Sequence, residues 1–129
     1  MNYDLNSMTK TFFFDSYALF EIIFRNKNYQ PYLDAQIILT KLNLFEVYYA
    51  LLREDQKSLA TTFIQKYSDF SIDFNQQTIE EAAHLKFFYK KNKLSMTDCI
   101  GYILAKKLEI KFLTGDKQFE YLENVEYVK

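Results

Sequence analysis

The sequence contains few of the residues that cross-link a chain or interrupt regular structure: one cysteine, one proline and two glycines among 129 residues. A single cysteine, Cys99, allows no internal disulfide and favours a reducing compartment. Because glycine and proline are scarce, loops should be short, and helices and strands should dominate. No apolar run approaches the roughly 20 residues that a membrane-spanning helix needs.

Charge of one sign is also lacking, because 16 Lys and Arg residues nearly balance 17 Asp and Glu residues. The net charge of −1 therefore provides no overall basic field to attract nucleic acid, although it says little about a local patch. The first ten residues are polar and include Asp4, so we interpret segment 1–10 as a tail and not as a signal peptide. These features predict a soluble cytoplasmic protein.

Apolar and aromatic residues, in contrast, are abundant. They make up 49% and 19% of the chain, which is ample for a buried core and argues against disorder. There is no internal repeat, low-complexity segment or linker that would divide the chain. We therefore predict one domain over residues 11–129.

Strand and helix patterns alternate along this domain. Short apolar runs bounded by turn residues predict five strands, at Thr11–Phe14, Gln36–Leu39, Ser71–Phe74, Glu109–Leu113 and Val125–Val128. Apolar residues at helical spacing predict helices over Ser16–Arg25, Lys41–Arg53, Asp55–Tyr67, Gln76–Lys91, Ser95–Lys107 and Lys117–Leu122. This alternation predicts an α/β fold with a parallel sheet covered on both faces.

Four acidic residues are placed where such a sheet would bring them together. Asp15 and Asp116 directly follow predicted strands, while Glu46 and Asp98 lie near the starts of predicted helices. If the first and fourth strands are neighbours, as in the strand order 3-2-1-4-5, all four acids fall at the carboxyl edge of the sheet. That edge, where the winding direction reverses, is where open α/β sheets bind ligands.

Glu46 is the most informative of the four acids. The apolar positions of its helix, which follow a 3.6-residue period, are Leu42, Phe45, Tyr49 and Leu52. Leu42 and Tyr49 lie about one turn on either side of Glu46, which places the carboxylate on or beside the face that packs inward. A carboxylate there is costly unless a cation or hydrogen-bond donors compensate it, and a metal ion would supply the missing charge.

The residue types at this edge favour one kind of chemistry. Clustered carboxylates without histidine or cysteine suit Mg²⁺ or Mn²⁺ better than Zn²⁺. One or two such ions clamp a phosphodiester and activate a water molecule. Because His84 is the only histidine and no Ser–His pair is evident, we expect metal-assisted hydrolysis and no covalent enzyme intermediate.

Simpler interpretations of the same residues stay open. Asp15 and Asp116 are each suited to cap the helix that follows, and Ser95 with Asp98 resembles a capping box. Glu46 has no capping role, and its alternative is a slightly different helix register that leaves it in solvent. A basic stretch consisting of Lys86, Lys90, Lys91 and Lys93 is either a solvated surface or a contact for RNA phosphates beside the acids.

The chain resembles PIN-domain ribonucleases from about Thr11 to Lys129. Four motifs carry the resemblance: Phe14-Asp15-Ser16 with Ala18-Leu19, Asn43 to Val47, Leu94 to Asp98 with Cys99-Ile100, and Phe112 to Asp116. Each motif alone is weak, but their order, spacing and positions relative to the predicted elements agree with the family. The resemblance implies a PIN-like three-layer α/β/α fold with a five-stranded parallel sheet, and a Mg²⁺- or Mn²⁺-dependent endoribonuclease.

Residue roles and partners also follow from the resemblance. Asp15 and Asp98 would be the direct metal ligands, Glu46 and Asp116 would hold a second ion or orient the attacking water, and Thr114 would be a donor behind them. Small members of the family resemble VapC toxins of type II toxin–antitoxin pairs, which implies RNA as substrate, a cognate antitoxin and a homodimer. The alternatives are an RNA-processing nuclease without an antitoxin and a catalytically silent PIN-like binding module.

Overall fold

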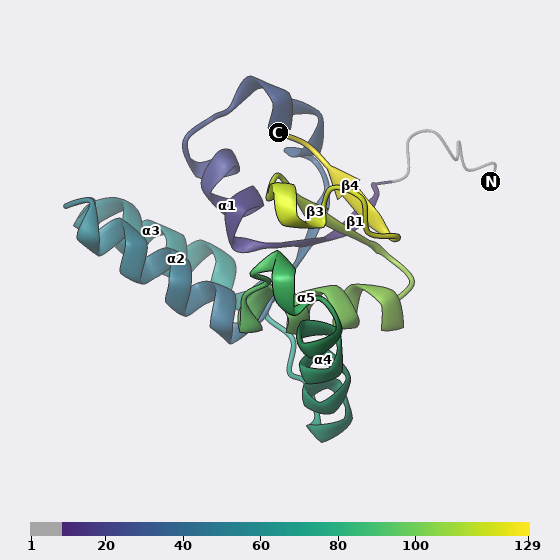
Figure 1. Cartoon of the computed structure of the whole chain (residues 1–129). Coiled ribbons are helices and arrows are strands. Elements are labelled where there is room, and N and C mark those ends of the chain that lie inside the picture. The colour runs from purple at the N-terminus through teal and green to yellow at the C-terminus, as the bar shows by residue number, and fades with distance from the viewer. Residues whose placement is uncertain (1–8) are drawn as a thin grey trace, which may run out of the picture.

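A four-stranded parallel sheet forms the centre of the computed structural model, which describes residues 9–129 (Figure 1). The strands are β1 (Thr11–Phe14), β2 (Gln36–Ile38), β3 (Lys111–Thr114) and β4 (Val125–Tyr127), in the spatial order β2-β1-β3-β4. Neighbouring strands are parallel, with Phe13 of β1 opposite both Ile38 of β2 and Phe112 of β3. The predicted tail mostly lies outside the described residues.

Helices cover the sheet and extend from it. The α-helices are α1 (Ser16–Ile23), α2 (Lys41–Arg53), α3 (Lys57–Tyr67), α4 (Gln76–Phe88) and α5 (Met96–Lys107). Short 3-10 segments are η2 (Lys27–Tyr32), η3 (Ser68–Phe70), η4 (Lys90–Asn92) and η5 (Lys117–Phe119). No helix in the described part of the chain combines the length and apolar character required to cross a bilayer.

The phenylalanine run of β1 divides the core into two layers. Alternate residues of a strand point to opposite faces of the sheet, and here Phe12 and Phe14 pack with α1, α2 and α3, whereas Phe13 packs with α4 and α5. In Figure 1, α1 and α5 accordingly lie on opposite sides of the sheet, and the α2–α3 hairpin extends away from it. The prediction of a parallel sheet covered on both faces is confirmed.

The predicted strand count was wrong. The described residues form four strands, because segment Ser71–Phe74 makes only one isolated parallel bridge, Ser71 with Leu39, next to β2. Ile72 and Phe74 gave this segment its alternating pattern, and they pack against the core under α4 and α5 without extending the ladder. The remaining strands keep the predicted order, with the first and fourth predicted strands side by side as β1 and β3.

Non-glycine residues with a left-handed backbone mark several element boundaries. They explain why α1 ends two residues before the predicted bound and why α3 begins two residues after it, whereas α2 and α5 end at the predicted residues. Arg25, Asp55, Lys93 and Glu109 have φ between 50° and 59°. Glu109 follows α5, and Ile110 N–H bonds Ala105 O at 3.0 Å, so β3 begins two residues later than predicted, at Lys111. In a chain with two glycines, these residues take the αL position that glycine usually fills at helix ends.

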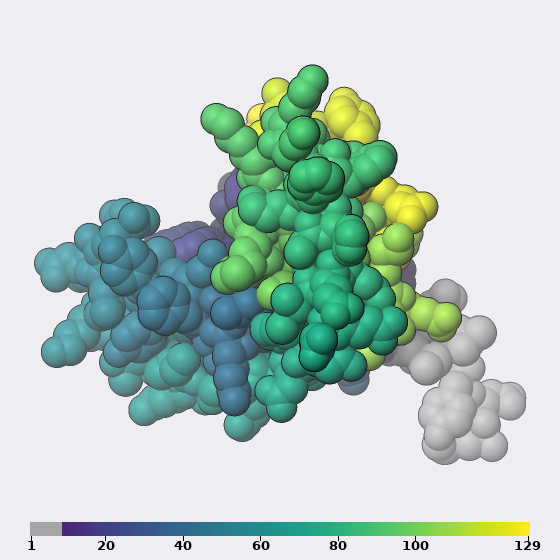
Figure 2. Space-filling model, turned by 60° about the horizontal axis from the view of Figure 1, so that its bottom comes forward, coloured from purple at the N-terminus to yellow at the C-terminus, as the bar shows by residue number. Residues whose placement is uncertain are grey.

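The inward face of α2 was also predicted wrongly. Its buried residues are Asn43, Leu44, Val47 and Leu51, whereas Phe45, Tyr49 and Leu52 are exposed, Phe45 to 71%. Both sets follow helical periodicity, because α2 has apolar residues on two sides. The α2–α3 hairpin and α4 stand as separate ridges in the space-filling view (Figure 2).

Gly101 allows α5 to approach β1 closely, and its replacement tests this packing. A Cβ at position 101 would lie 2.4 Å from the ring of Phe13, which is fully buried. We therefore predict that Gly101→Ala lowers the free energy of unfolding by roughly 1–3 kcal/mol, the usual cost of overpacking a core. Urea denaturation measures it, and Met96→Ala, at an exposed position of the same helix, should change stability by only a few tenths of a kcal/mol. Equal stability of Gly101→Ala and wild type would contradict this packing.

Candidate metal centre

Two acids meet at the carboxyl edge of the sheet because β1 and β3 are neighbours. Asp15 directly follows β1, and Asp116 stands two residues beyond β3. Phe14 is paired with Leu113, and Asp15 N–H donates to Leu113 O at 3.2 Å, so the two strand ends are held in register.

The Asp15 carboxylate is buried and its direction is fixed. Its side chain is 1% exposed and caps α1, with Ala18 N–H donating to Oδ1 at 2.8 Å. The Thr114 hydroxyl donates to Oδ2 and accepts the Asp116 N–H at 2.9 Å. Thr114 therefore connects the residue after β1 with the turn after β3.

Asp98 is brought to the same edge by the first turn of α5. Ser95 caps this helix by accepting the Asp98 N–H at 3.0 Å. Burial, followed by the charges of Glu46 and Asp116, raises the pKa of Asp98 from 3.8 to about 7. Because both carboxylates act on Asp98, helices α2 and α5 and the turn after β3 converge at one place.

Glu46 is held by a short chain of polar side chains. The Ser16 hydroxyl, at the start of α1, donates to Glu46 Oε1 at 2.7 Å and accepts from Asn43 Nδ2 at 3.1 Å. Asn43 is fully buried, and its Oδ1 accepts the backbone N–H of Thr40, the N-cap of α2, at 3.0 Å. The sequence patterns predicted no role for Ser16 or Asn43. The amide of Asn43 among the apolar residues of α2 was a signal that could have revealed its role.

Capping and clustering occur together in this site. Asp15 caps α1, and Asp116 caps η5 by accepting the Gln118 N–H at 2.9 Å. The simpler interpretation of both residues is thus correct for their local role. Capping is compatible with a place in the acid cluster, because each of these carboxylates uses one of its two oxygens to accept the capping N–H.

Within residues 9–129, no basic side chain forms an ion pair with these acids. The ion pairs in the described residues join Lys106 to Glu123 and Lys107 to Glu81, away from the four acids. Burial, and then the charges of Asp98 and Asp116, raise the pKa of Asp15 well above its usual value. The edge therefore carries like charges that repel one another and lack a counter-charge within residues 9–129.

Comparison with known proteins agrees with this arrangement. Residues 12–125 match the family described as PIN domain. The chain belongs to the PIN domain family. No curated protein matches this PIN domain. Among solved structures, a chain of a toxin–antitoxin complex from Klebsiella pneumoniae aligns with a TM-score of 0.70 at 20% identity, covering 89% of this chain and 95% of that chain. At this identity the likeness shows the fold.

The donor chemistry of the site fits a hard divalent cation. The available ligands are carboxylate oxygens, they lack a counter-charge, and a cation would relieve their repulsion. As the side chains stand, the described residues contain no group of three or more His, Cys, Asp or Glu side chains arranged to hold an ion. Magnesium commonly binds through only one or two protein carboxylates and keeps several of its waters. The side chains of this PIN domain suit such a partly hydrated ion better than an ion enclosed entirely by protein ligands.

Acid repulsion should make this PIN domain less stable at higher pH when metal is absent. Because the folded-state pKa of Asp98 is raised from 3.8 to about 7, the folded protein keeps a proton that the unfolded chain has released, and stability falls between roughly pH 4 and 7. Asp98→Asn removes this charge and should raise the free energy of unfolding at pH 8 by about 1–3 kcal/mol, since a pKa unit corresponds to about 1.4 kcal/mol and the acids titrate together.

Thermal unfolding in EDTA at pH 5.5 and pH 8 measures this effect. The melting temperature of the wild-type protein should be higher at pH 5.5 than at pH 8. In Asp98→Asn the difference between these two melting temperatures should be smaller. The exposed Asp69, in η3, provides a matched control, and Asp69→Asn should behave as wild type. A wild-type protein that gains stability from pH 5.5 to pH 8 would contradict the proposed repulsion.

Proposed function

We propose that this PIN domain is a metal-dependent endoribonuclease and the toxin of a type II toxin–antitoxin pair. PIN domains are generally nucleases that use divalent metal ions, and this chain belongs to that family. The observation that carries the proposal is the group of mutually repelling carboxylates at the carboxyl edge of the sheet, with Asp15 buried and fixed by Thr114.

Each acid has a role in this proposal. Asp15 and Asp98 would hold Mg²⁺ or Mn²⁺ directly, and Glu46 and Asp116 would hold a second ion or orient the attacking water. The ion, when bound, lowers the pKa of a water molecule and offsets charge on the scissile phosphodiester. Thr114 positions Asp15 by donating to one of its oxygens. Ser16 positions Glu46 in the same way, at 2.7 Å.

The basic stretch, which begins in the last turn of α4 and continues beyond it, is proposed to contact the RNA backbone. Lys90, Lys91 and Lys93 are exposed, and Phe87 and Phe88 beside them are 71% and 78% exposed. Lysines attract phosphates, and exposed aromatic rings stack on unpaired bases. Lys86 ties this stretch to the site, because its ammonium donates to Leu94 O immediately before the N-cap of α5.

The toxin assignment has its own support. A structural neighbour is a chain of a toxin–antitoxin complex, at an identity that shows the fold alone. The homodimer prediction is supported by the exposed apolar side of α2, where Phe45 and Tyr49 stack at 6.1 Å between ring centroids. An RNA-processing nuclease without an antitoxin remains the alternative, and an adjoining reading frame for a small DNA-binding protein would favour the toxin. A catalytically silent PIN-like module, the other alternative, would bind its ligand without cleaving RNA.

Removing either proposed metal ligand should abolish cleavage. We expect Asp15→Asn and Asp98→Asn to lower RNA hydrolysis in Mn²⁺ by at least about 10²-fold, since each takes away negative charge that the ion needs. Asp69→Asn, which alters an exposed acid elsewhere, should retain wild-type activity. Circular dichroism checks that the variants are folded. Wild-type rates in either folded site variant would exclude the proposed nuclease site.

Reversing a charge in the basic stretch should weaken RNA binding and leave the four clustered carboxylates at the sheet edge unchanged. We expect Lys91→Glu to raise the Kd for a single-stranded RNA and to lower the slope of log Kd against log salt by about one, because one phosphate contact is lost. Lys57→Glu, at the exposed start of α3, is the control. If both variants have the same Kd and salt slope as wild type, the stretch is a solvated surface.

A further inference from the structure

A fully buried tyrosine, Tyr29 of η2, lies in the apolar layer on the α1 side of the sheet. It belongs to the same core cluster as Phe14, Leu19 and Leu113. A phenylalanine would fill the same space, whereas a buried hydroxyl is costly unless it finds a hydrogen-bond partner. The Tyr29 hydroxyl therefore marks a contact that core packing alone does not require.

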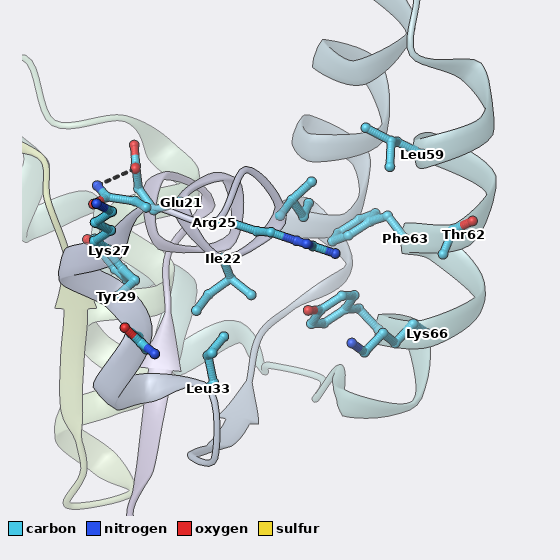
Figure 3. A pocket seen from close by; sticks show the side chains of 14 residues that line it. Glu21, Ile22, Arg25, Lys27, Tyr29, Leu33, Leu59, Thr62, Phe63 and Lys66 are labelled. Carbon is cyan, nitrogen blue, oxygen red and sulfur yellow. Dashed lines mark hydrogen bonds between the residues drawn. The ribbon is translucent and has the colours of Figure 1, made fainter.

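The segment η2 holds Tyr29 in a defined position. Asn26 caps η2 by accepting the Asn28 N–H at 2.9 Å, and its backbone oxygen accepts the Tyr29 N–H at 2.9 Å. The Asn26 amide also donates to Glu21 of α1 at 2.6 Å, and this bond is the dashed line in Figure 3, which labels Tyr29 as well. The position of Tyr29 thus depends on α1, whose N-cap is Asp15.

The Tyr29 hydroxyl connects to the acidic edge through the end of β4. It donates to the backbone oxygen of Val128 at 2.5 Å, across 99 residues of the chain. The Val128 N–H in turn donates to Thr114 O at 2.9 Å. Thr114 is the residue whose hydroxyl donates to Asp15 and accepts the Asp116 N–H. Burial, followed by the charge of Asp15, raises the pKa of Tyr29, so its hydroxyl stays protonated and able to donate.

Gly115 allows the end of β4 to lie directly against the turn after β3, which consists of residues 114–116. A Cβ at position 115 would lie 2.5 Å from Val128 O and 2.2 Å from the ring of Tyr17. Both distances are too short for non-bonded atoms in a close-packed interior. Glycine therefore permits Val128 to contact the residue that separates Thr114 from Asp116.

A second tyrosine of η2 bonds β4 at a different place. The Tyr32 hydroxyl donates to the Glu126 carboxylate at 2.6 Å. Glu126 is paired with Leu113, one position before the turn after β3 begins. Tyr32 thus joins the same two elements as Tyr29 but does not bond Val128, which makes it a matched control.

We propose that Tyr29 is a positioning residue for the acidic edge. Its hydroxyl holds Val128, and Val128 holds the turn after β3, so that Asp15 and Asp116 stay oriented toward a divalent cation. The proposal rests on the proposed nuclease function, which requires that cation, and it adds a residue outside the acid cluster on which the cation affinity depends. Tyr29 acts through other residues and touches neither the cation nor RNA.

Amide hydrogen exchange, measured by NMR on the metal-free full chain, tests whether Tyr29 holds the turn. Tyr29→Phe keeps the ring and removes the hydroxyl. We expect the protection factors of the Val128 and Asp116 N–H groups to fall about tenfold relative to those of the α5 amides, which report global unfolding. Tyr32→Phe should leave these relative factors within about twofold of wild type. Equal relative protection of Asp116 in wild type and Tyr29→Phe would overturn the proposal.

Titration with Mn²⁺ tests the consequence for the cation. Loss of a group that supports metal ligands commonly weakens metal binding about 10–100-fold. Because two hydrogen bonds separate Tyr29 from Thr114, we expect Tyr29→Phe to raise the calorimetric Kd for Mn²⁺ by about three- to tenfold. Tyr32→Phe should bind Mn²⁺ as wild type does. An equal increase of the Kd in both variants would overturn the proposal, because it would indicate general loosening of β4.

The dependence of RNA cleavage on Mn²⁺ separates positioning from a general structural defect. In Tyr29→Phe the Mn²⁺ concentration that gives half the maximal rate should rise by the same factor as the Kd, while the rate at saturating Mn²⁺ stays within about twofold of wild type. A reduced rate that additional Mn²⁺ does not restore would overturn the proposal.

Failure of the nuclease site and failure of the Tyr29 proposal give different results. A wild-type protein that binds Mn²⁺ without cleaving RNA contradicts the nuclease alone, because the Kd values of the variants still test Tyr29. Equal Mn²⁺ binding by wild type and Tyr29→Phe excludes only the role of Tyr29. A wild-type protein that does not bind Mn²⁺ excludes both.

Discussion

Repulsion between carboxylates at one edge of the sheet is the constraint around which this PIN domain is organised. Burying the Asp15 carboxylate costs free energy, and placing Asp98 and Asp116 near it increases the cost. Two hydrogen bonds, from Thr114 and from the Ala18 N–H, offset part of that cost. No basic side chain of the described residues offsets the remaining cost. A bound divalent cation would offset it.

The surrounding elements serve to hold these acids in place. Parallel pairing of β1 with β3 brings two of the acids to one edge. Close packing of α5 on β1 at Gly101 fixes the helix whose first turn carries Asp98. A fully buried Asn43 and the Ser16 hydroxyl fix Glu46. Core packing and site geometry are thus parts of the same arrangement, since helices on both faces of the sheet contribute to the edge.

Local sequence patterns predicted much of this structure. The run of phenylalanines before Asp15 predicted β1 with its observed bounds, and the neighbourhood of the first and fourth predicted strands was correct. The PIN family prediction, made from four short motifs, is confirmed. These successes share a cause: apolar runs ending in an acid are local signals, and the chirality of parallel crossovers limits how they are assembled.

Other features depend on tertiary context that no local pattern contains. Ser71–Phe74 alternates like a strand, but its apolar residues pack without a ladder. Helix α2 has two apolar sides, and periodicity alone could not show that Phe45 faces solvent and Leu44 the core. The roles of Ser16 and Asn43 arise from contacts made across 30 and 27 residues, respectively. The metal-ligand roles of the acids remain predictions.

Calorimetric titration of the metal-free protein with Mn²⁺ at pH 7.5 tests the central claim most directly, because it requires no substrate. We predict saturable binding by wild type and by Asp69→Asn, and loss of that binding in Asp15→Asn and Asp98→Asn. Absence of binding to the wild-type protein, or equal binding to all four proteins, would contradict the claim that these carboxylates form a cation site.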